Sequence, residues 1–169
     1  MIFGYLFTIL NYVIYSVGRF RARKEQILFF DLAAKVSYII GLYFMGSLSG
    51  ALSMVVTFFY LICANIKERK GYKWPAAYVF FEAMLFLVMV KSFAGISSIL
   101  MFISSTIALL CVWWLPPQKM RVLGFVGNCV SLSYNLSIRN WGGLFEVIVM
   151  TSNLTSYLKY RKAQKGETS

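Results

Sequence analysis

Seven apolar stretches follow one another along the chain, separated by short polar segments. They cover residues 1–18, 27–45, 48–66, 75–90, 96–115, 122–138 and 142–158. Most are close to the roughly 20 apolar residues that a helix needs to cross the hydrocarbon core of a bilayer. In lipid, a helix satisfies its backbone hydrogen bonds within the segment. The pattern therefore predicts an all-α integral membrane protein with seven transmembrane helices, the fourth of which is interrupted by Glu82.

The composition supports lipid as the solvent for this chain. Apolar residues make up 59% of the 169 residues and charged residues only 14%, whereas about a quarter of an ordinary soluble domain is charged. A soluble domain of this size buries only about two-thirds of the surface of its unfolded chain. It would therefore leave a large apolar surface in water.

Lysine and arginine collect in alternate polar segments. Fourteen of the 17 basic residues lie in four of them, at residues 19–24, 67–73, 119–121 and 159–165. The other segments hold only Lys91 and Arg139, and Lys35 lies inside an apolar run. Because basic loops stay in the cytoplasm, the alternation predicts an outside N-terminus and a cytoplasmic C-terminus. The first run has its charges after it rather than before it, unlike a signal peptide.

The organisation of the chain repeats after 93 residues. Under this shift the first three runs fall on the last three, and Ser49-Gly50 falls on Gly142-Gly143. A unit of three helices starts on one side of the membrane and ends on the other. A second unit in the same orientation therefore requires one extra crossing between the two, which gives a 3+1+3 arrangement. We expect a first three-helix bundle at 1–70, a linker helix at 71–93, a second bundle at 94–162 and a cytoplasmic tail at 163–169. Parallel repeats of this kind place a binding site near the bilayer midplane, between the halves.

Small residues recur at helical spacing within the runs. Ala33, Ser37 and Gly41 lie four residues apart on the second run. Small side chains at this spacing let two helix backbones approach closely. The second run is therefore expected to pack tightly against a neighbouring helix.

Asp31 and Lys35 are the pair of charges most clearly inside a predicted span. They lie one turn apart in the order that favours an intrahelical ion pair, and either charge alone is costly at mid-bilayer. One interpretation is a self-neutralising pair whose lysine reaches toward the interface. The other is that Lys35 faces a polar cavity and attracts an anionic or hydroxylated solute. The residue 93 positions after Lys35 is Asn128, which is also polar and favours the cavity.

The remaining intramembrane polar residues have similar alternatives. Glu82 has no charged residue within one turn, so it either hydrogen-bonds a bundle helix or relays a proton. Glu146 is placed at a helix N-terminus, where the helix dipole stabilises it, or it belongs to the pocket. Asn135 and Asn153 either bind a solute or tie helices together. Asn11 is expected to link helices.

The C-terminal half carries a family resemblance. A basic residue opens the sixth run, Tyr134-Asn135 stands near its end, Gly142-Gly143 lies at the following turn and Glu146 lies just inside the seventh run. With Asn153 and the basic tail, these features of residues 119–161 resemble the YgjV-type family of bacterial inner-membrane proteins. The resemblance implies a location in the bacterial inner membrane. That family looks like a distant relative of the SWEET, SemiSWEET and PQ-loop transporters, which implies their 3+1+3 fold.

The prolines depart from the transporter pattern. PQ-loop transporters resemble one another in prolines within their bundle helices, which are thought to act as hinges. Here Pro116-Pro117-Gln118 stands at the cytoplasmic end of the fifth run, and Pro75 begins the fourth, where proline is a good first-turn residue. The chain therefore lacks the proline hinges that are thought to let PQ-loop transporters open first to one side of the membrane and then to the other.

Several function classes have no support in the sequence. Histidine is absent and the three cysteines lack metal-ligand spacing, so no enzyme activity, metal site or cofactor is expected. The net charge of +11 lies in short clusters, which argues against nucleic acid.

Membrane lipid and a small polar solute are the expected partners, and a homo-oligomer is compatible with the pattern but not indicated by it. The leading hypothesis is a small-solute transporter or facilitator with a midplane pocket. The alternative is a non-transporting membrane protein that binds or modulates a partner.

Overall fold

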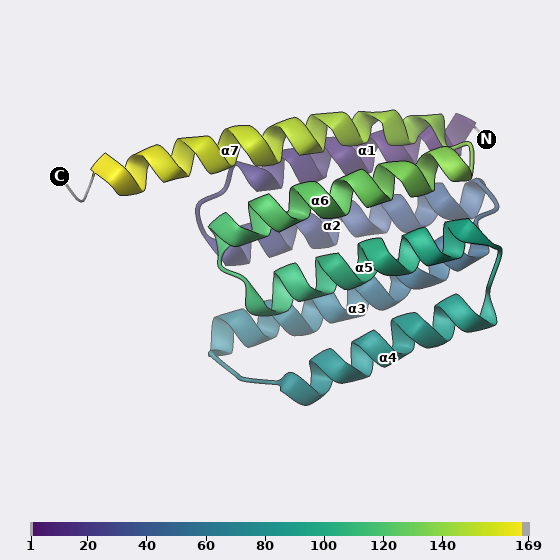
Figure 1. Ribbon diagram of the computed structural model, residues 1–169, viewed down its shortest axis with the longest axis horizontal. Helices are drawn as coiled ribbons and strands as arrows, with labels where there is room; N and C mark the ends of the chain where they lie inside the picture. The colour runs from purple at the N-terminus through teal and green to yellow at the C-terminus, as the bar shows by residue number, and fades with distance from the viewer. Residues whose placement is uncertain (1, 167–169) are drawn as a thin grey trace.

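The computed structural model describes residues 2–166 of the chain, with side chains to residue 162, and every regular element in that part is a helix (Figure 1). Each predicted apolar run contains one α-helix, and the seventh begins with a short 3-10 helix, so the all-α prediction is confirmed. The seven α-helices and one 3-10 helix are α1 (Ile2–Arg19), α2 (Lys24–Phe44), α3 (Leu48–Lys70), α4 (Pro75–Lys91), α5 (Ile96–Trp114), α6 (Pro117–Ser137), η1 (Trp141–Phe145) and α7 (Glu146–Gly166).

Most helices extend beyond the apolar runs that predicted them. α2 begins at Lys24 and α6 at Pro117, each a few residues before its run. α7 continues to Gly166, so residues 163–166 prolong the last helix instead of forming a separate tail. Residues 167–169 of the predicted tail and residue 1 of the first run lie outside the described residues.

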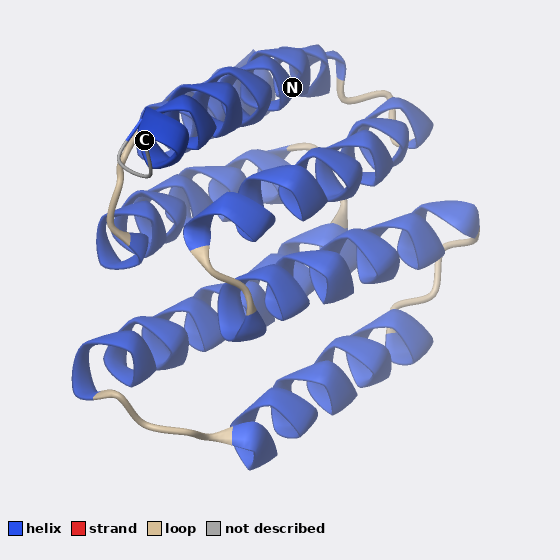
Figure 2. Ribbon diagram, turned by 60° about the vertical axis from the view of Figure 1, so that its left-hand side comes forward, coloured by secondary structure: helices blue, strands red, loops and turns tan. Residues whose placement is uncertain are grey.

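Six of the helices form a closed ring. Going round it, the neighbouring pairs in contact are α1–α2, α2–α3, α3–α5, α5–α6, α6–α7 and α7–α1. α4 packs on the outside of the ring, against α3 and α5, and lies at the edge of the bundle in both ribbon views (Figures 1 and 2). Consecutive helices run in opposite directions through the bundle (Figure 1).

Proline and glycine set several of the helix ends. Proline stands in the first turn of α4 and of α6, where its missing N–H costs no hydrogen bond. α3 ends at Gly71, which adopts the left-handed conformation with φ of 67° and donates its N–H to the carbonyl of Lys67. A side chain at that φ would be strained, so the sequence ends the helix there.

Close contact between α1 and α2 depends on glycine. A Cβ atom on Gly41 would lie 2.9 Å from Thr8 Oγ1 and 3.1 Å from the carbonyl oxygen of Gly4. The tight packing predicted for this face of α2 is confirmed at Gly41 and at the buried Ser37, whereas Ala33 is exposed. The contact brings the polar faces of α1 and α2 together inside the ring.

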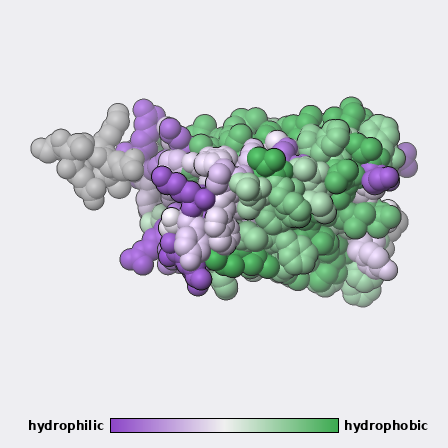
Figure 3. Space-filling view, turned by 90° about the horizontal axis from the view of Figure 1, so that it is seen from below, coloured by the Kyte–Doolittle hydropathy of each residue, from purple (hydrophilic) through white to green (hydrophobic). Residues whose placement is uncertain are grey.

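The outer surface of the bundle is apolar over most of its length. Figure 3 shows hydrophobic residues across the middle of one face, and most of the hydrophilic residues at the end where the C-terminus lies. Large apolar side chains such as Phe29, Phe80 and Ile96 are more than half exposed, which a lipid environment makes favourable. Three helices, α2, α3 and α5, are both long and apolar enough to cross a bilayer by length and hydropathy.

Candidate functional site

A polar cavity of about 70 Å³ lies inside the ring of helices. All six ring helices contribute to its lining, whereas α4 contributes none. Its four charged lining residues are Arg19, Asp31, Lys35 and Glu146. A polar space of this size has room for a few water molecules or one small solute. It is well below the volume of a typical drug-sized ligand site.

The lining follows the 93-residue repeat. Six positions of the first half line the cavity together with the positions 93 residues later. These pairs are Asn11 with Ser104, Tyr15 with Ala108, Arg19 with Val112, Asp31 with Gly124, Lys35 with Asn128, and Tyr38 with Ser131. The first half supplies the charged and aromatic members, and the second half supplies the smaller ones. The open space thus results from small residues facing large polar ones.

Glu146 is held by hydrogen-bond donors from two helices. Its Oε2 accepts from Tyr12 Oη at 2.7 Å, from Ser131 Oγ at 2.9 Å and from Asn135 Nδ2 at 3.4 Å. The side chain is 3% exposed. Glu146 is the first residue of α7, so the predicted N-terminal position is correct. Its contacts also place it in the cavity wall.

Asn135 is the hub of this network. Its Oδ1 accepts from Tyr38 Oη at 3.0 Å and from Asn140 Nδ2 at 2.8 Å, and its Nδ2 donates to Tyr12 Oη at 2.8 Å. Gly143 packs directly on the Asn135 side chain, and a Cβ atom on it would overlap Asn135 Cβ. Glycine at position 143 is therefore explained by the space that Asn135 occupies. Asn135 ties helices together rather than lining the cavity.

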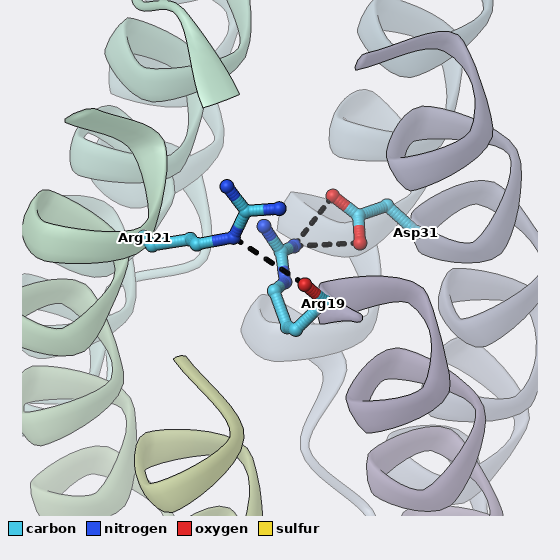
Figure 4. Close-up of polar contacts among 3 residues, drawn as sticks. All are labelled: Arg19, Asp31 and Arg121. Carbon is cyan, nitrogen blue, oxygen red and sulfur yellow. Dashed lines mark hydrogen bonds and ion pairs between the residues drawn. The ribbon is translucent and has the colours of Figure 1, made fainter. Parts of the chain in front are cut away.

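Asp31 pairs with Arg19 at the other end of the cavity. Arg19 Nη2 donates to Asp31 Oδ1 at 2.6 Å and to Oδ2 at 2.7 Å, and both side chains are buried (Figure 4). The guanidinium also stacks over the Tyr15 ring, 3.9 Å from its centroid. The interpretation of Asp31 and Lys35 as a self-neutralising pair was wrong. Arg19 is the last residue of α1 and lies inside the bundle rather than in a loop. There it forms the ion pair with the Asp31 carboxylate.

A second buried arginine closes the same end. Arg121 of α6 donates from Nη2 to the carbonyl oxygen of Arg21 at 2.7 Å and from Nε to that of Arg19 at 3.4 Å. Figure 4 shows its side chain reaching across to the end of α1. Tyr160 of α7 donates to the carbonyl oxygen of Phe20 at 2.8 Å. The carbonyls at the end of α1 and just after it are thus bound by side chains of α6 and α7.

Lys35 has no ionic partner within the described residues. Its Nζ lies 3.4 Å from Met54 Sδ and 5.7 Å from the centroid of the Tyr38 ring. No carboxylate oxygen lies within 4.0 Å of it, and it lines the cavity. The predicted snorkelling toward the interface was therefore also wrong. Lys35 is one of the residues that line the cavity, and a role for it in binding a solute stays a prediction.

Asn128 faces the same cavity from α6. Its side chain is 7% exposed, and its Nδ2 is buried without a hydrogen-bond acceptor among the described residues. A buried donor without a partner costs free energy unless a solute or water accepts its hydrogen bond. Lys35 and Asn128 are therefore two spare donors among the lining residues of one cavity.

Besides Asn135, two of the predicted site residues do not line the cavity. Glu82 lies on α4, outside the ring, and its Oε1 accepts a hydrogen bond from Thr106 Oγ1 of α5 at 2.6 Å. This is the helix-to-helix bond that was one of its two predicted roles. Asn153 is fully buried on α7 beside Gly124, and neither of its amide atoms has a hydrogen-bond partner among the residues whose side chains are described.

The sequence reasoning missed Arg19, Arg121, Tyr12 and Tyr38. The arginines were counted with the basic loops, and the tyrosines were not distinguished from other aromatic residues. One signal was present for Arg19. It follows Gly18 at the very end of an apolar run, where a side chain can still point back into the bundle, and an unpaired acid lies on the next run.

A helical bundle with an apolar exterior and charged groups meeting in its interior is a membrane protein. The chain belongs to the family described as bacterial inner membrane protein (Imp-YgjV), whose sequence model matches residues 2–164. The family resemblance seen in residues 119–161 is thereby confirmed for nearly the whole chain. Comparison with curated proteins and comparison with solved structures gave no match.

Proposed function

We propose that this inner-membrane protein is a transporter or facilitator for a small polar solute, and that the solute binds in the cavity within the ring. The observation that carries the proposal is the pair of spare donors there, Lys35 and Asn128. A lysine inside a membrane without an ionic partner costs about 2.5–3.5 kcal/mol on insertion scales. Such a cost is expected at a functional position rather than at a structural one.

The architecture proposed for this function is 3+1+3. The contacts of the ring support it. Exchanging the two halves replaces α1 by α5 and α7 by α3, so the contact between α1 and α7 corresponds to the contact between α5 and α3. The six pairs of lining residues 93 positions apart support it as well. A cavity shared by two related halves is the arrangement in which rocking of one half against the other gives alternating access.

The lining favours an anionic or hydroxylated solute of few atoms. Lys35, Asn128 and the Arg19–Asp31 pair offer N–H donors, and the volume of about 70 Å³ limits the size of what they hold. Glu146 already receives three hydrogen bonds from the protein, so its Oε2 has little need of a donor from the solute. We therefore expect short carboxylates or small polyols rather than sugars.

Uptake into liposomes tests the proposal. The probes are radiolabelled acetate, lactate and glycerol, and the variants are Lys35→Gln and, as a matched removal of one charge, Lys91→Gln at the exposed end of α4. We expect the wild-type protein and Lys91→Gln to carry at least one probe, and Lys35→Gln to carry it at least tenfold more slowly. Thermal unfolding in detergent confirms that both variants are folded.

Two outcomes would contradict the proposal. One is a wild-type protein that is neither stabilised nor made to carry flux by a broad panel of small metabolites, which would favour the alternative of a non-transporting partner protein. The other is equal uptake by Lys35→Gln and Lys91→Gln, which would show that the cavity lysine has no part in the path.

A further inference from the structure

A second concave site lies on the outside of the bundle, between α6 and α7. It is an open groove of about 480 Å³ at the basic end of the two helices. Leu115, Val122, Leu123 and Val126 form its apolar wall together with Tyr157, and the polar lining consists of Gln118, Lys119 and Arg161. It shares no lining residue with the interior cavity.

Every polar side chain of the groove can donate an N–H. Lys119 and Arg161 are cations without a carboxylate partner within 4.0 Å among the described residues, and no acid lines the groove. Gln118 Oε1 accepts a hydrogen bond from Arg121 Nη1 at 3.3 Å, whereas its Nε2 is buried and lacks an acceptor. The rim therefore has spare donors and positive charge for a ligand that only accepts hydrogen bonds.

The beginning of α6 adds to this preference. The helix begins at Pro117 without a side-chain cap, so Gln118 and Lys119 stand in its first turn. The backbone N–H groups of a first turn have no intrahelical acceptors, and phosphate groups bind readily at such ends. The positive end of the helix dipole thus coincides with the two cations of the rim.

The apolar wall leads from this rim toward the middle of the bundle. Val126 is seven residues after Lys119 on α6, which corresponds to roughly 10 Å along the helix axis. Val122 and Val126 are about half exposed. A ligand that fits has a negative head at the rim and an apolar chain along α6.

We propose that this groove, defined by Gln118, Lys119, Val122, Val126, Tyr157 and Arg161, binds one anionic phospholipid of the surrounding leaflet. Its phosphate contacts Lys119, Arg161 and the unpaired backbone N–H groups of the first turn of α6, and an acyl chain follows the wall. A basic pocket between helices at a membrane surface is a recurrent site for anionic lipid headgroups. A second copy of the chain is a poor occupant because it would bring the same positive rim. The site does not depend on transport through the cavity.

Native mass spectrometry of the purified protein tests this site, with phosphatidylglycerol and phosphatidylcholine of identical acyl chains as probes. We expect the wild-type protein to retain phosphatidylglycerol at least tenfold more tightly than phosphatidylcholine. The double variant Lys119→Gln/Arg161→Gln should lose about tenfold or more of the phosphatidylglycerol affinity. The control Lys70→Gln/Lys73→Gln removes the same charge from exposed positions elsewhere on the chain and should change it less than twofold.

A third variant tests the apolar wall separately from the charges. Val126→Trp fills the groove while keeping both cations, and it is expected to weaken phosphatidylglycerol binding several-fold. Equal loss in the two charge variants would mean that binding is diffuse, and would overturn the proposal. So would displacement by millimolar inorganic phosphate, because the site would then bind free phosphate without a lipid chain, or unchanged binding in Val126→Trp.

Discussion

At the scale of single residues, Arg19 and Asp31 form an ion pair, and of the two ion pairs among the described residues it is the one in which both side chains are buried. The exposed fractions of their side chains are 2% and 4%, against 10% and 31% for Lys24 and Glu68 in the other pair. Removing one partner of a buried pair leaves a charge in a low-dielectric interior, whereas replacing both by apolar residues is often nearly neutral. The two pairs should therefore respond very differently to substitution.

Asp31→Asn is expected to lower the free energy of unfolding by about 3–5 kcal/mol, because Arg19 is left without its carboxylate. The double variant Arg19→Met/Asp31→Leu should lose less than the single variant. Lys24→Gln/Glu68→Gln, the control at the more exposed pair, should lose less than about 1 kcal/mol. Reversible unfolding in mixed micelles measures all three. Equal losses for Asp31→Asn and for the control would contradict the ion-pair assignment.

At the scale of the elements, the junction of α6, η1 and α7 depends on the space around Asn135. Gly143 leaves no room for a Cβ atom there, whereas a Cβ on Gly124 in α6 would meet Asn153 at an ordinary contact distance of 3.7 Å. Two glycines in neighbouring elements thus have different roles. One permits a close approach, and the other lines the cavity without being sterically required.

Gly143→Ala should therefore destabilise the protein by about 1–3 kcal/mol, the usual cost of overpacking. Gly124→Ala should be neutral or slightly stabilising, because alanine favours a helix interior over glycine. Thermal unfolding of the two variants, prepared in the same detergent, makes the comparison. A larger loss in Gly124→Ala than in Gly143→Ala would show that the packing around Asn135 is misassigned.

The sequence predicted the elements better than the contacts between them. The seven apolar runs predicted seven helices, and Lys35 and Asn128, which lie 93 positions apart, both line the cavity. The ion pair of Asp31 was not predictable from spacing along one helix, since Arg19 belongs to a different helix. Glu82 does not line the cavity because α4 lies outside the ring, and hydropathy does not tell which of seven apolar helices stands outside.

At the scale of the whole molecule, the ring and its basic end predict how the chain lies in the membrane. The basic segments after α1, α3 and α5 and the end of α7 belong to one end of the bundle, because consecutive helices alternate in direction (Figure 1). The positive-inside rule assigns that end to the cytoplasm. The proposed orientation is therefore N-terminus outside and C-terminus inside.

Reporter fusions measure this orientation directly. A phosphatase that is active only outside is fused to the N-terminus, and a fluorescent protein that fluoresces only in the cytoplasm is fused to the C-terminus. Both reporters should be active in the proposed orientation. A control fusion in the loop between α2 and α3, at Gly46, should behave as an outside site. Both chain ends on the same side of the membrane would contradict seven crossings.

The proposed transport requires the cavity within the ring to open to water, and Cys111 provides a native probe of that opening. Cys111 lines the cavity at 5% exposure, whereas Cys63 and Cys129 do not line it. In a Cys63→Ala/Cys129→Ala background, a small membrane-impermeant methanethiosulfonate added to intact vesicles should modify Cys111. The transported solute, once found, should slow that modification. Complete protection of Cys111 in native membranes, with full modification only after unfolding, would contradict the proposal.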